Sequence, residues 1–207
     1  MNKRGSIVYV VDDDVSVCRS LTLLLKSHGY KVLSFTRAAD FLACRRPNIP
    51  SCLVLDIRLP DISGLALQET MAARKLALPI IFITGHGDIP MSVKAVKAGA
   101  IDFLPKPFTE KKLLAAVELA VAKSKTENKE QSEVRKIQRR IKALTPREQE
   151  VFRLVAKGML SKQIARKLGT TLQTIKVHRS RVMQKMQAYS VTELVRFAQK
   201  AGIIPTR

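Results

Sequence analysis

The stretch CLVLD, at Cys52–Asp56, decides the fold of the first half of the chain, because four apolar residues run without a break into a single aspartate. Near-continuous apolar runs are typical of strands whose two faces are both covered by helices, as in parallel sheets. Helical spacing of apolar residues follows in Gly64–Ala73. A strand that leads into a helix is the repeating unit of an α/β domain.

The same unit repeats on both sides of this stretch. The further expected strands are Ser6–Val11, Lys31–Phe35, Pro79–Thr84 and Ile101–Leu104, and the further expected helices are Val15–Ser27, Ala38–Arg45, Met91–Ala98 and Thr109–Lys123. Five strand–helix units in about 120 residues predict a doubly wound, five-stranded parallel α/β sheet.

The sequence pattern of the second half of the chain, after Leu144, predicts helices only. Thr145 is expected to cap the first of them, with Pro146 in its first turn and Glu148 at the third helical position. Four helices are expected, at about residues 146–157, 161–168, 171–187 and 190–201, and glycines end three of them. The short turn between the second and the third is typical of a helix-turn-helix.

Residues 124–143 connect the two halves. Neither proline nor glycine occurs between Phe108 and Thr145, and a composition rich in Lys, Glu, Gln and Arg favours helix. The segment either extends the preceding helix or forms a helix of its own, and its apolar positions either pack against a domain or mediate dimerisation. They span too few heptads to indicate a coiled coil. We therefore expect domains at residues 1–123 and 144–207, with a helical linker at 124–143.

The positive charge is concentrated towards the C-terminus. Of the net charge of +20, residues 144–207 contribute +10, with 13 basic and 3 acidic residues. This excess suits a polyanion such as nucleic acid, although a solvated basic surface is the alternative. No apolar run is long enough to span a bilayer and no signal peptide is recognisable, so we expect a cytoplasmic protein without a membrane partner. Cys18, Cys44 and Cys52 lack the spacing of a metal site and are expected to be reduced.

Polar residues gather where the expected strands end. Asp12, Asp13 and Asp14 follow the first strand, Asp56 ends the third, Thr84 ends the fourth and Lys106 follows the fifth. The carboxyl ends of parallel strands lie at one edge of the sheet, where ligands bind. Carboxylates crowded there need a cation, and oxygen ligands favour Mg²⁺. Asp56 is the candidate nucleophile for phosphoryl transfer, with Lys106 and Thr84 placed to bind phosphoryl oxygens; taken singly, each could be an ordinary cap or loop residue.

The segments VVDDD, LVLDIRLPDISG, IIFITGHGD and KAGAIDFLPKPF resemble the receiver domain of two-component response regulators, over about residues 6–123. The resemblance implies a flavodoxin-like or CheY-like fold with Asp56 as phospho-acceptor. It also implies a Mg²⁺ site made of Asp13, Asp56 and the backbone carbonyl of Arg58, with Asp12 contributing through water. Thr84 and Phe103 would be the switch pair, and Lys106 would bind the phosphoryl group next to a cis Lys106–Pro107 peptide. The family often has a glutamate in the acidic run where this chain has Asp14, a change that we expect to be minor.

The segment LTPREQEVFRLVAKGMLSKQIARKLGTTLQTIKVHRSRVMQKM resembles the LuxR-type helix-turn-helix of the FixJ/NarL class, from Leu144 to about Gly202. The resemblance implies that the third helix enters the major groove of DNA with Lys176, Val177, Arg179 and Ser180, while Lys162 and Thr171 meet phosphates. Thr174 also lies on the side suited to DNA, and His178 fits packing or a phosphate contact better than base reading. The last helix, at Val191–Ala198, would be a dimer face. Ser161 and Thr170 depart from the residues frequent in the family, Asn and Ile.

Together the two resemblances imply a phosphorylation-controlled transcription regulator. Its partners would be a sensor histidine kinase, double-stranded promoter DNA, RNA polymerase and, on phosphorylation, a second copy of the chain. Two alternatives stay open: a DNA-binding protein whose receiver no longer switches, and a phosphatase or phosphotransferase that acts on a small substrate. Against the enzyme, Arg58 stands where an acid/base aspartate would be expected, two residues after Asp56.

Overall fold

The structure of the protein is a computed structural model that describes residues 5–85 and 95–205. The chain divides into two compact units, residues 1–128 and residues 129–207. Within the described ranges, none of the helices combines the length and the hydropathy that a bilayer span requires.

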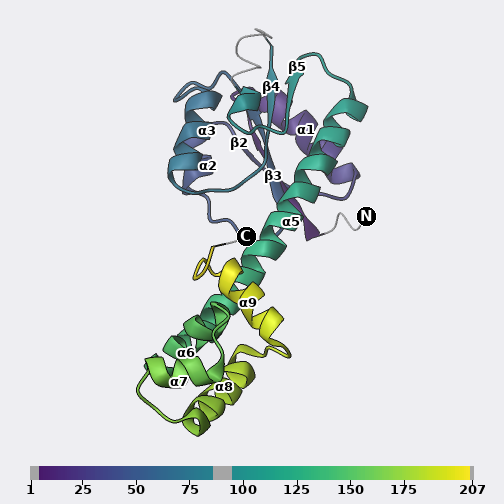
Figure 1. Cartoon of the computed structure of the whole chain (residues 1–207). Helices are drawn as coiled ribbons and strands as arrows, with labels where there is room; N and C mark the ends of the chain where they lie inside the picture. The colour runs from purple at the N-terminus through teal and green to yellow at the C-terminus, as the bar shows by residue number, and fades with distance from the viewer. Residues whose placement is uncertain (1–4, 86–94, 206–207) are drawn as a thin grey trace. The chain divides into compact units, whose positions relative to one another are not determined.

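The first unit is built on a parallel sheet of five strands in the order β2-β1-β3-β4-β5 (Figure 1). The strands are β1 Ile7–Val11, β2 Lys31–Phe35, β3 Ser51–Asp56, β4 Ile80–Thr84 and β5 Asp102–Pro105. This is the flavodoxin-like strand order, and it confirms the predicted fold class. In register, Val11 pairs with Leu55 and Asp56 pairs with Ile83, so the carboxyl ends of the three central strands lie next to each other.

Helices cover both faces of this sheet. Helices α1 (Val15–Ser27) and α5 (Glu110–Lys142) pack on the face that carries Val8, Val10, Cys52, Val54, Ile81 and Ile83. Helices α2 (Ala38–Ala43) and α3 (Gly64–Ala73) pack on the opposite face, which carries Ile7, Tyr9, Leu53, Leu55 and Phe82. The alternation of strand side chains between two covered faces explains why the strands are apolar throughout. Of the helix expected at Met91–Ala98, residues 91–94 lie outside the described residues, and residues 95–97 are helical.

Helix α5 is longer than the helix expected at Thr109–Lys123, because it continues without a break to Lys142. Of the two alternatives for the linker, the structure therefore shows the extension of the preceding helix. Residues 129–142 of this helix belong to the second unit. There Ile137 is buried and Ile141 packs against the same core, while the Arg140 guanidinium donates to the carbonyl oxygen of Met186 (3.1 Å) and contacts the side chain of Gln187. The apolar stripe of the linker thus packs against the helical domain.

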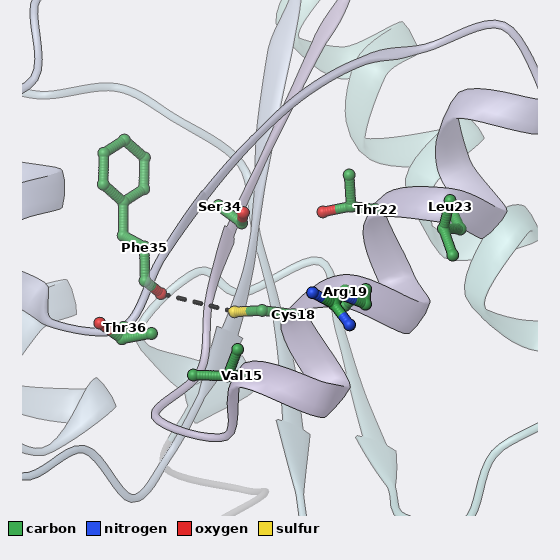
Figure 2. A pocket seen from close by; sticks show the side chains of 8 residues that line it. All are labelled: Val15, Cys18, Arg19, Thr22, Leu23, Ser34, Phe35 and Thr36. Atoms are coloured by element: carbon green, nitrogen blue, oxygen red, sulfur yellow. Dashed lines mark hydrogen bonds between the residues drawn. The ribbon is translucent and has the colours of Figure 1, made fainter.

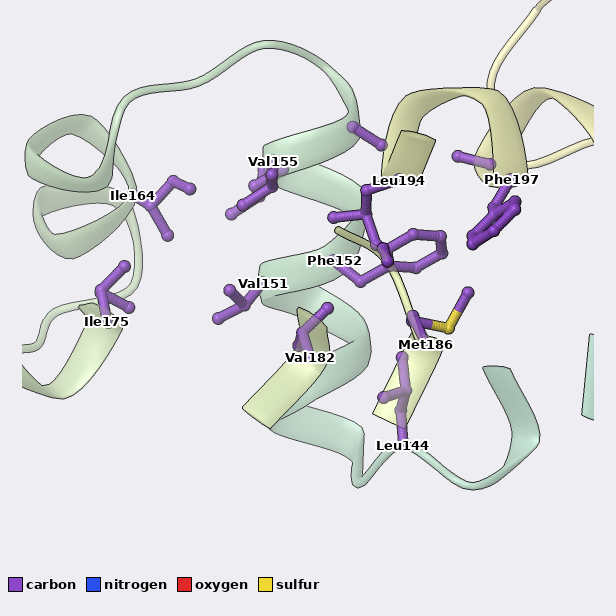
Figure 3. Packing of buried hydrophobic residues seen from close by; sticks show 14 of the residues in the cluster. Leu144, Val151, Phe152, Val155, Ile164, Ile175, Val182, Met186, Leu194 and Phe197 are labelled. Carbon is purple, nitrogen blue, oxygen red and sulfur yellow. The ribbon is translucent and has the colours of Figure 1, made fainter. Parts of the chain in front are cut away.

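The other helices of the second unit are α6 Pro146–Ala156, α7 Ser161–Lys167, α8 Leu172–Met186 and α9 Val191–Lys200. Helix α6 begins with the expected capping box, in which Thr145 N donates to Glu148 Oε2 (2.8 Å) and Glu148 N donates to Thr145 Oγ1 (3.3 Å). Figure 3 shows Phe152 of α6 facing Leu194 and Phe197 of α9 in the core of this unit. This core holds α8 in place by one face and leaves its other face to solvent.

Candidate functional site

The carboxyl edge of the sheet gathers three polar side chains that are almost fully buried. Asp12 follows β1 and is 1% exposed, Asp56 ends β3 and is 5% exposed, and Thr84 ends β4 and is 1% exposed. The register of the central strands brings these ends together, as the sequence predicted. Two carboxylates buried at this depth require compensation by positive charge or by hydrogen bonds.

Lys106 supplies the positive charge. Its Nζ donates to Asp12 Oδ2 at 2.6 Å and to Asp56 Oδ1 at 3.0 Å, so that one ammonium group bridges two residues that are 44 positions apart in the chain. The backbone N–H of Lys106 also donates to the Thr84 carbonyl oxygen (2.6 Å), which anchors the residue to the end of β4. The Lys106–Pro107 peptide is cis, as the resemblance to receiver domains implied.

Backbone donors hold the other oxygen of each carboxylate. Asp14 N donates to Asp12 Oδ1 (3.0 Å), and Arg58 N donates to Asp56 Oδ2 (2.8 Å). Each carboxylate is therefore fixed in orientation by two donors that come from different loops. A nucleophile whose rotamer is locked in this way is preorganised for attack.

Burial sets the electrostatics of this cluster. Burial raises the pKa of Asp12, and the negative charge of Asp56 adds to the increase, while the hydrogen bond from Lys106 opposes it. Burial lowers the pKa of Lys106, but the hydrogen bonds to Asp12 and Asp56 outweigh it, so the pKa lies above the usual value for lysine. Lys106 is therefore an ammonium cation at neutral pH.

Asp13 and Asp14 lie beside the cluster in different roles. Both are exposed. Asp14 caps helix α1, with its carboxylate accepting from Ser16 N (2.7 Å) and Val17 N (3.3 Å). Because Asp14 acts as the N-cap of α1, an aspartate suits a position where a glutamate is frequent in the family.

The donor set at this edge is made of oxygen atoms. The carboxylates of Asp12, Asp13 and Asp56 and the carbonyl of Arg58 are the candidates. In the part of the chain that the structure describes, no group of three or more His, Cys, Asp or Glu side chains is arranged to hold a metal ion. Mg²⁺ needs no such group, because it binds through one or two carboxylates and keeps several waters. One lysine balances only one of the two buried negative charges, so the residues present fit a hard divalent cation.

The two residues expected to form a switch lie on neighbouring strands. Thr84 is buried at the end of β4, and Phe103, on β5, is half-buried and packs against the cluster on the α2/α3 face. Phe103 also lines an open groove of about 520 Å³ with Pro107, Phe108 and Lys112. Residues 86–94, which include His86, follow Thr84 in the chain and lie outside the described residues.

A second hollow, of about 330 Å³, lies between α1 and β2 (Figure 2). Its lining residues are Val15, Cys18, Arg19, Thr22, Leu23, Ser34, Phe35 and Thr36, none of which is acidic. The Cys18 thiol donates to the carbonyl oxygens of Asp12 (3.3 Å) and Phe35 (3.6 Å). All three cysteines are free, and burial raises the pKa of the Cys18 and Cys52 thiols, so these two are packing residues and poor nucleophiles.

The second unit presents a helix-turn-helix, formed by α7, the turn at Gly169 and α8. Thr171 caps α8 by accepting from Thr174 N (3.1 Å). The buried side of α8 consists of Ile175, Val182 and Met186. The residues expected to meet DNA are otherwise mostly exposed: Lys162, Thr171, Lys176, Val177 and Ser180 are exposed, and Thr174 is half-buried.

Arg179 differs from these residues. It is half-buried, and its Nη1 donates to Ser161 Oγ, at the start of α7, over 2.9 Å. Ser161 does not cap its own helix, because Leu160 is the N-cap residue of α7. His178 is also half-buried, and its Nδ1 has no hydrogen-bond partner among the described residues.

Sequence reasoning missed an ion pair between a buried glutamate and an exposed lysine in this unit. Glu148, 2% exposed, accepts a hydrogen bond from Lys185 Nζ (2.7 Å), and this contact holds the pKa of the glutamate below its usual range. The contact joins α6 to the C-terminal half of α8. The capping box pointed to Glu148, but no local pattern connects it to a lysine 37 residues away.

Two family models match the chain. Residues 8–118 match the response regulator receiver domain, and residues 142–198 match the luxR family of bacterial regulatory proteins. Receiver domains generally bind Mg²⁺ at their phosphorylation site.

Curated relatives match over nearly the whole chain. Nodulation protein W of Bradyrhizobium diazoefficiens is 46% identical over 198 residues, which cover 96% of this chain and 87% of the relative. Transcriptional regulatory protein FixJ of the same species is 40% identical over 204 residues, which cover 99% of each. Among solved structures, response regulator StyR matches with a TM-score of 0.84 at 45% identity, covering 95% of this chain and 99% of the other. Full-length FixJ from B. japonicum matches with a TM-score of 0.56 at 39% identity, covering 98% and 99%.

Proposed function

The chain belongs to the response regulators that join a receiver domain to a LuxR-type DNA-binding domain, and we propose that Asp56 is the residue through which it is controlled. The protein is a phosphorylation-dependent transcription regulator of a two-component system. The family consists of DNA-binding transcription factors that are typically not enzymes. The observation that carries the proposal is the buried Asp56 carboxylate, held by Arg58 N and by the same ammonium group that binds Asp12.

The reaction at this site is the transfer of a phosphoryl group from a phosphohistidine of the partner kinase. An oxygen of the Asp56 carboxylate attacks phosphorus, the P–N bond breaks, and its electron pair returns to the imidazole nitrogen. Lys106 lies within hydrogen-bond distance of Asp56 and offsets the charge of the phosphoryl oxygens. The Thr84 hydroxyl, at the end of the neighbouring strand, supplies a further donor to those oxygens.

The residues that would hold Mg²⁺ are Asp12, Asp13, Asp56 and the backbone carbonyl of Arg58. When bound there, the ion offsets negative charge that builds up on the transferred group. Asp12 and Asp56 supply this site with preoriented oxygens, because backbone N–H groups fix both carboxylates.

Phosphorylation of Asp56 changes the positions of Thr84 and Phe103, which lie on β4 and β5. Their rearrangement favours a homodimer, and the paired helical domains then bind promoter DNA and recruit RNA polymerase as an activator. Towards the duplex we place Lys162, Thr171, Thr174, Lys176, Val177, Arg179 and Ser180. Because bacterial promoters lie in the cytoplasm, the protein acts there.

Labelling with radioactive acetyl phosphate and Mg²⁺ tests the phospho-acceptor. Asp56→Asn should abolish label that hydroxylamine releases, and it should abolish dimerisation induced by the donor. Asp61→Asn is the matched control, because that carboxylate accepts from Ala38 N and Ala39 N at the start of α2 and takes no part in the cluster. Unchanged labelling in Asp56→Asn would overturn the assignment. Equal DNA affinity with and without the donor would favour a receiver that no longer switches.

A further inference from the structure

Arg179 lies closer to the buried side of α8 than Lys176, Val177 and Ser180, the exposed residues expected to read bases. Successive residues of an α-helix are about 100° apart, so residues three or four apart share a face. Arg179 follows Ile175 by four positions and precedes Val182 by three, and both of these residues are buried. Val177, two positions before Arg179, is 41% exposed and points away from that buried stripe. Arg179 therefore extends along the seam between α8 and α7.

Ser161 fixes the end of the Arg179 side chain. The Ser161 hydroxyl accepts from Nη1 at 2.9 Å, at the first residue of α7. A guanidinium group has five N–H donors, and this hydrogen bond uses one of them. Within the described ranges, Arg179 forms no ion pair with a carboxylate. A fixed arginine thus keeps both its charge and most of its donors for a ligand outside the protein.

The place where Arg179 is held determines which part of DNA it meets. In a helix-turn-helix the first helix crosses the DNA backbone while the second lies in the major groove. The guanidinium is bound to the start of the first helix, α7, next to the exposed Lys162. Planar guanidinium groups pair well with phosphate, and phosphate contacts carry no direct sequence information.

We infer that Arg179 is a phosphate-binding residue held in place by Ser161, and that it does not read base edges. This inference rests on the proposed DNA-binding function and changes the role of one residue that the sequence had placed in the major groove. Base choice then belongs to the exposed side of α8, where Lys176, Val177 and Ser180 lie. Ser161 is a positioning residue, because it acts on DNA only through Arg179.

The test compares two substitutions on α8, Arg179→Ala and Val177→Ala, in the full chain treated with acetyl phosphate. The probes are a duplex selected from a random library by the unaltered chain and a duplex of the same composition with shuffled sequence. Arg179→Ala should weaken binding to both duplexes by the same factor, on the order of tenfold, and should reduce the slope of log affinity against log salt by about one. Val177→Ala should weaken binding only to the selected duplex.

Substitutions at Ser161 test the positioning. Ser161→Ala should reproduce the Arg179→Ala pattern in weaker form, and Ser161→Asn, which restores a side-chain oxygen, should recover the affinity. A changed base preference in Arg179→Ala would overturn the inference. So would an unchanged salt slope combined with a loss of DNA affinity that is matched by a lower melting temperature of the variant. If the unaltered chain binds no duplex in either phosphorylation state, the proposed function fails as well. Binding by the unaltered chain with the wrong pattern in Arg179→Ala refutes only the inference.

Discussion

The acidic edge of the sheet and the exposed side of α8 are both short sets of polar residues, but the protein holds them very differently. At the sheet edge, Asp12 and Asp56 are buried and each has two fixed donors. On α8, Lys176, Val177 and Ser180 are exposed to solvent. Electrostatic interactions in a buried charged cluster are strong because the local dielectric is low and the geometry is fixed. On an exposed surface, binding is the sum of many contacts that are each weak. Substitutions at the two places should therefore differ in the size of their effects and in the property that they change.

The largest effect is expected from removal of the cation at the sheet edge. Lys106→Ala should slow phosphorylation by acetyl phosphate by roughly 10²–10³-fold, the usual effect of losing one preorganised donor to a developing negative charge. The rate is measured by the accumulation of phosphoprotein at fixed Mg²⁺ concentration. Lys111→Ala, an exposed lysine on α5, is the control and should leave the rate unchanged. An unchanged rate in a folded Lys106→Ala protein would mean that the lysine only neutralises the buried carboxylates.

This difference between the two places also explains which features the sequence could predict. The topology of a parallel sheet places all strand ends at one edge, so Asp12, Asp56 and Lys106 could be brought together from strand assignments alone. The fold class followed from the same pattern. The course of α5 could not be decided, because the polar segment after Lys123 favours helix but carries little information about packing.

On the helical domain, the resemblance indicated which residues face DNA but not which tertiary contacts hold them. The resemblance placed Arg179 with Lys176, Val177 and Ser180, but Arg179 is half-buried and bonded to Ser161, whereas the other three are exposed. The bond from Lys185 to Glu148 and the capping of α2 by Asp61 were missed for a related reason. Such contacts join groups that are far apart in the chain and leave no periodic signal.

An intermediate effect is expected at the ion pair between Glu148 and Lys185. Glu148→Gln keeps a capping-box residue at the third helical position but removes the charge that faces Lys185, and it should lower the free energy of unfolding of the second unit by about 1–2 kcal/mol. The loss is modest because the Lys185 side chain is 38% exposed and turns to solvent easily. Glu150→Gln, which breaks an exposed pair with Arg147, is the matched control and should cost less than about 0.5 kcal/mol. Hydrogen exchange of α6 and α8 amides assigns the loss to this unit, and equal losses in the two variants would contradict the difference in burial.

The ion pair between Glu148 and Lys185 also predicts that the stability of the second unit depends on pH. Because the pKa of Glu148 is lowered in the folded protein, its stabilisation is present above the pKa of the unfolded chain, about 4.3. It is lost as the pH falls through the lower value of the folded state. The advantage of the unaltered chain over Glu148→Gln should therefore be constant near neutral pH and should narrow below pH of about 4. An advantage that grows towards low pH would show that the glutamate is not stabilised in its charged form.

The smallest effect is expected at Thr171, where a helix cap and a proposed phosphate contact coincide. Thr171→Ala should cost about 1 kcal/mol of stability, because Thr174 N loses its acceptor. Thr171→Asp retains an acceptor and places a negative charge at the helix start, which the helix favours, so stability should be kept. The same charge would face a phosphate, and DNA affinity should fall by about tenfold, as 1.4 kcal/mol of repulsion produces. Thr171→Ser, the control, should change neither quantity. If Thr171→Asp binds the selected duplex as tightly as the unaltered chain, the residue is a cap alone, and the phosphate contacts of this domain come from α7 and its seam with α8.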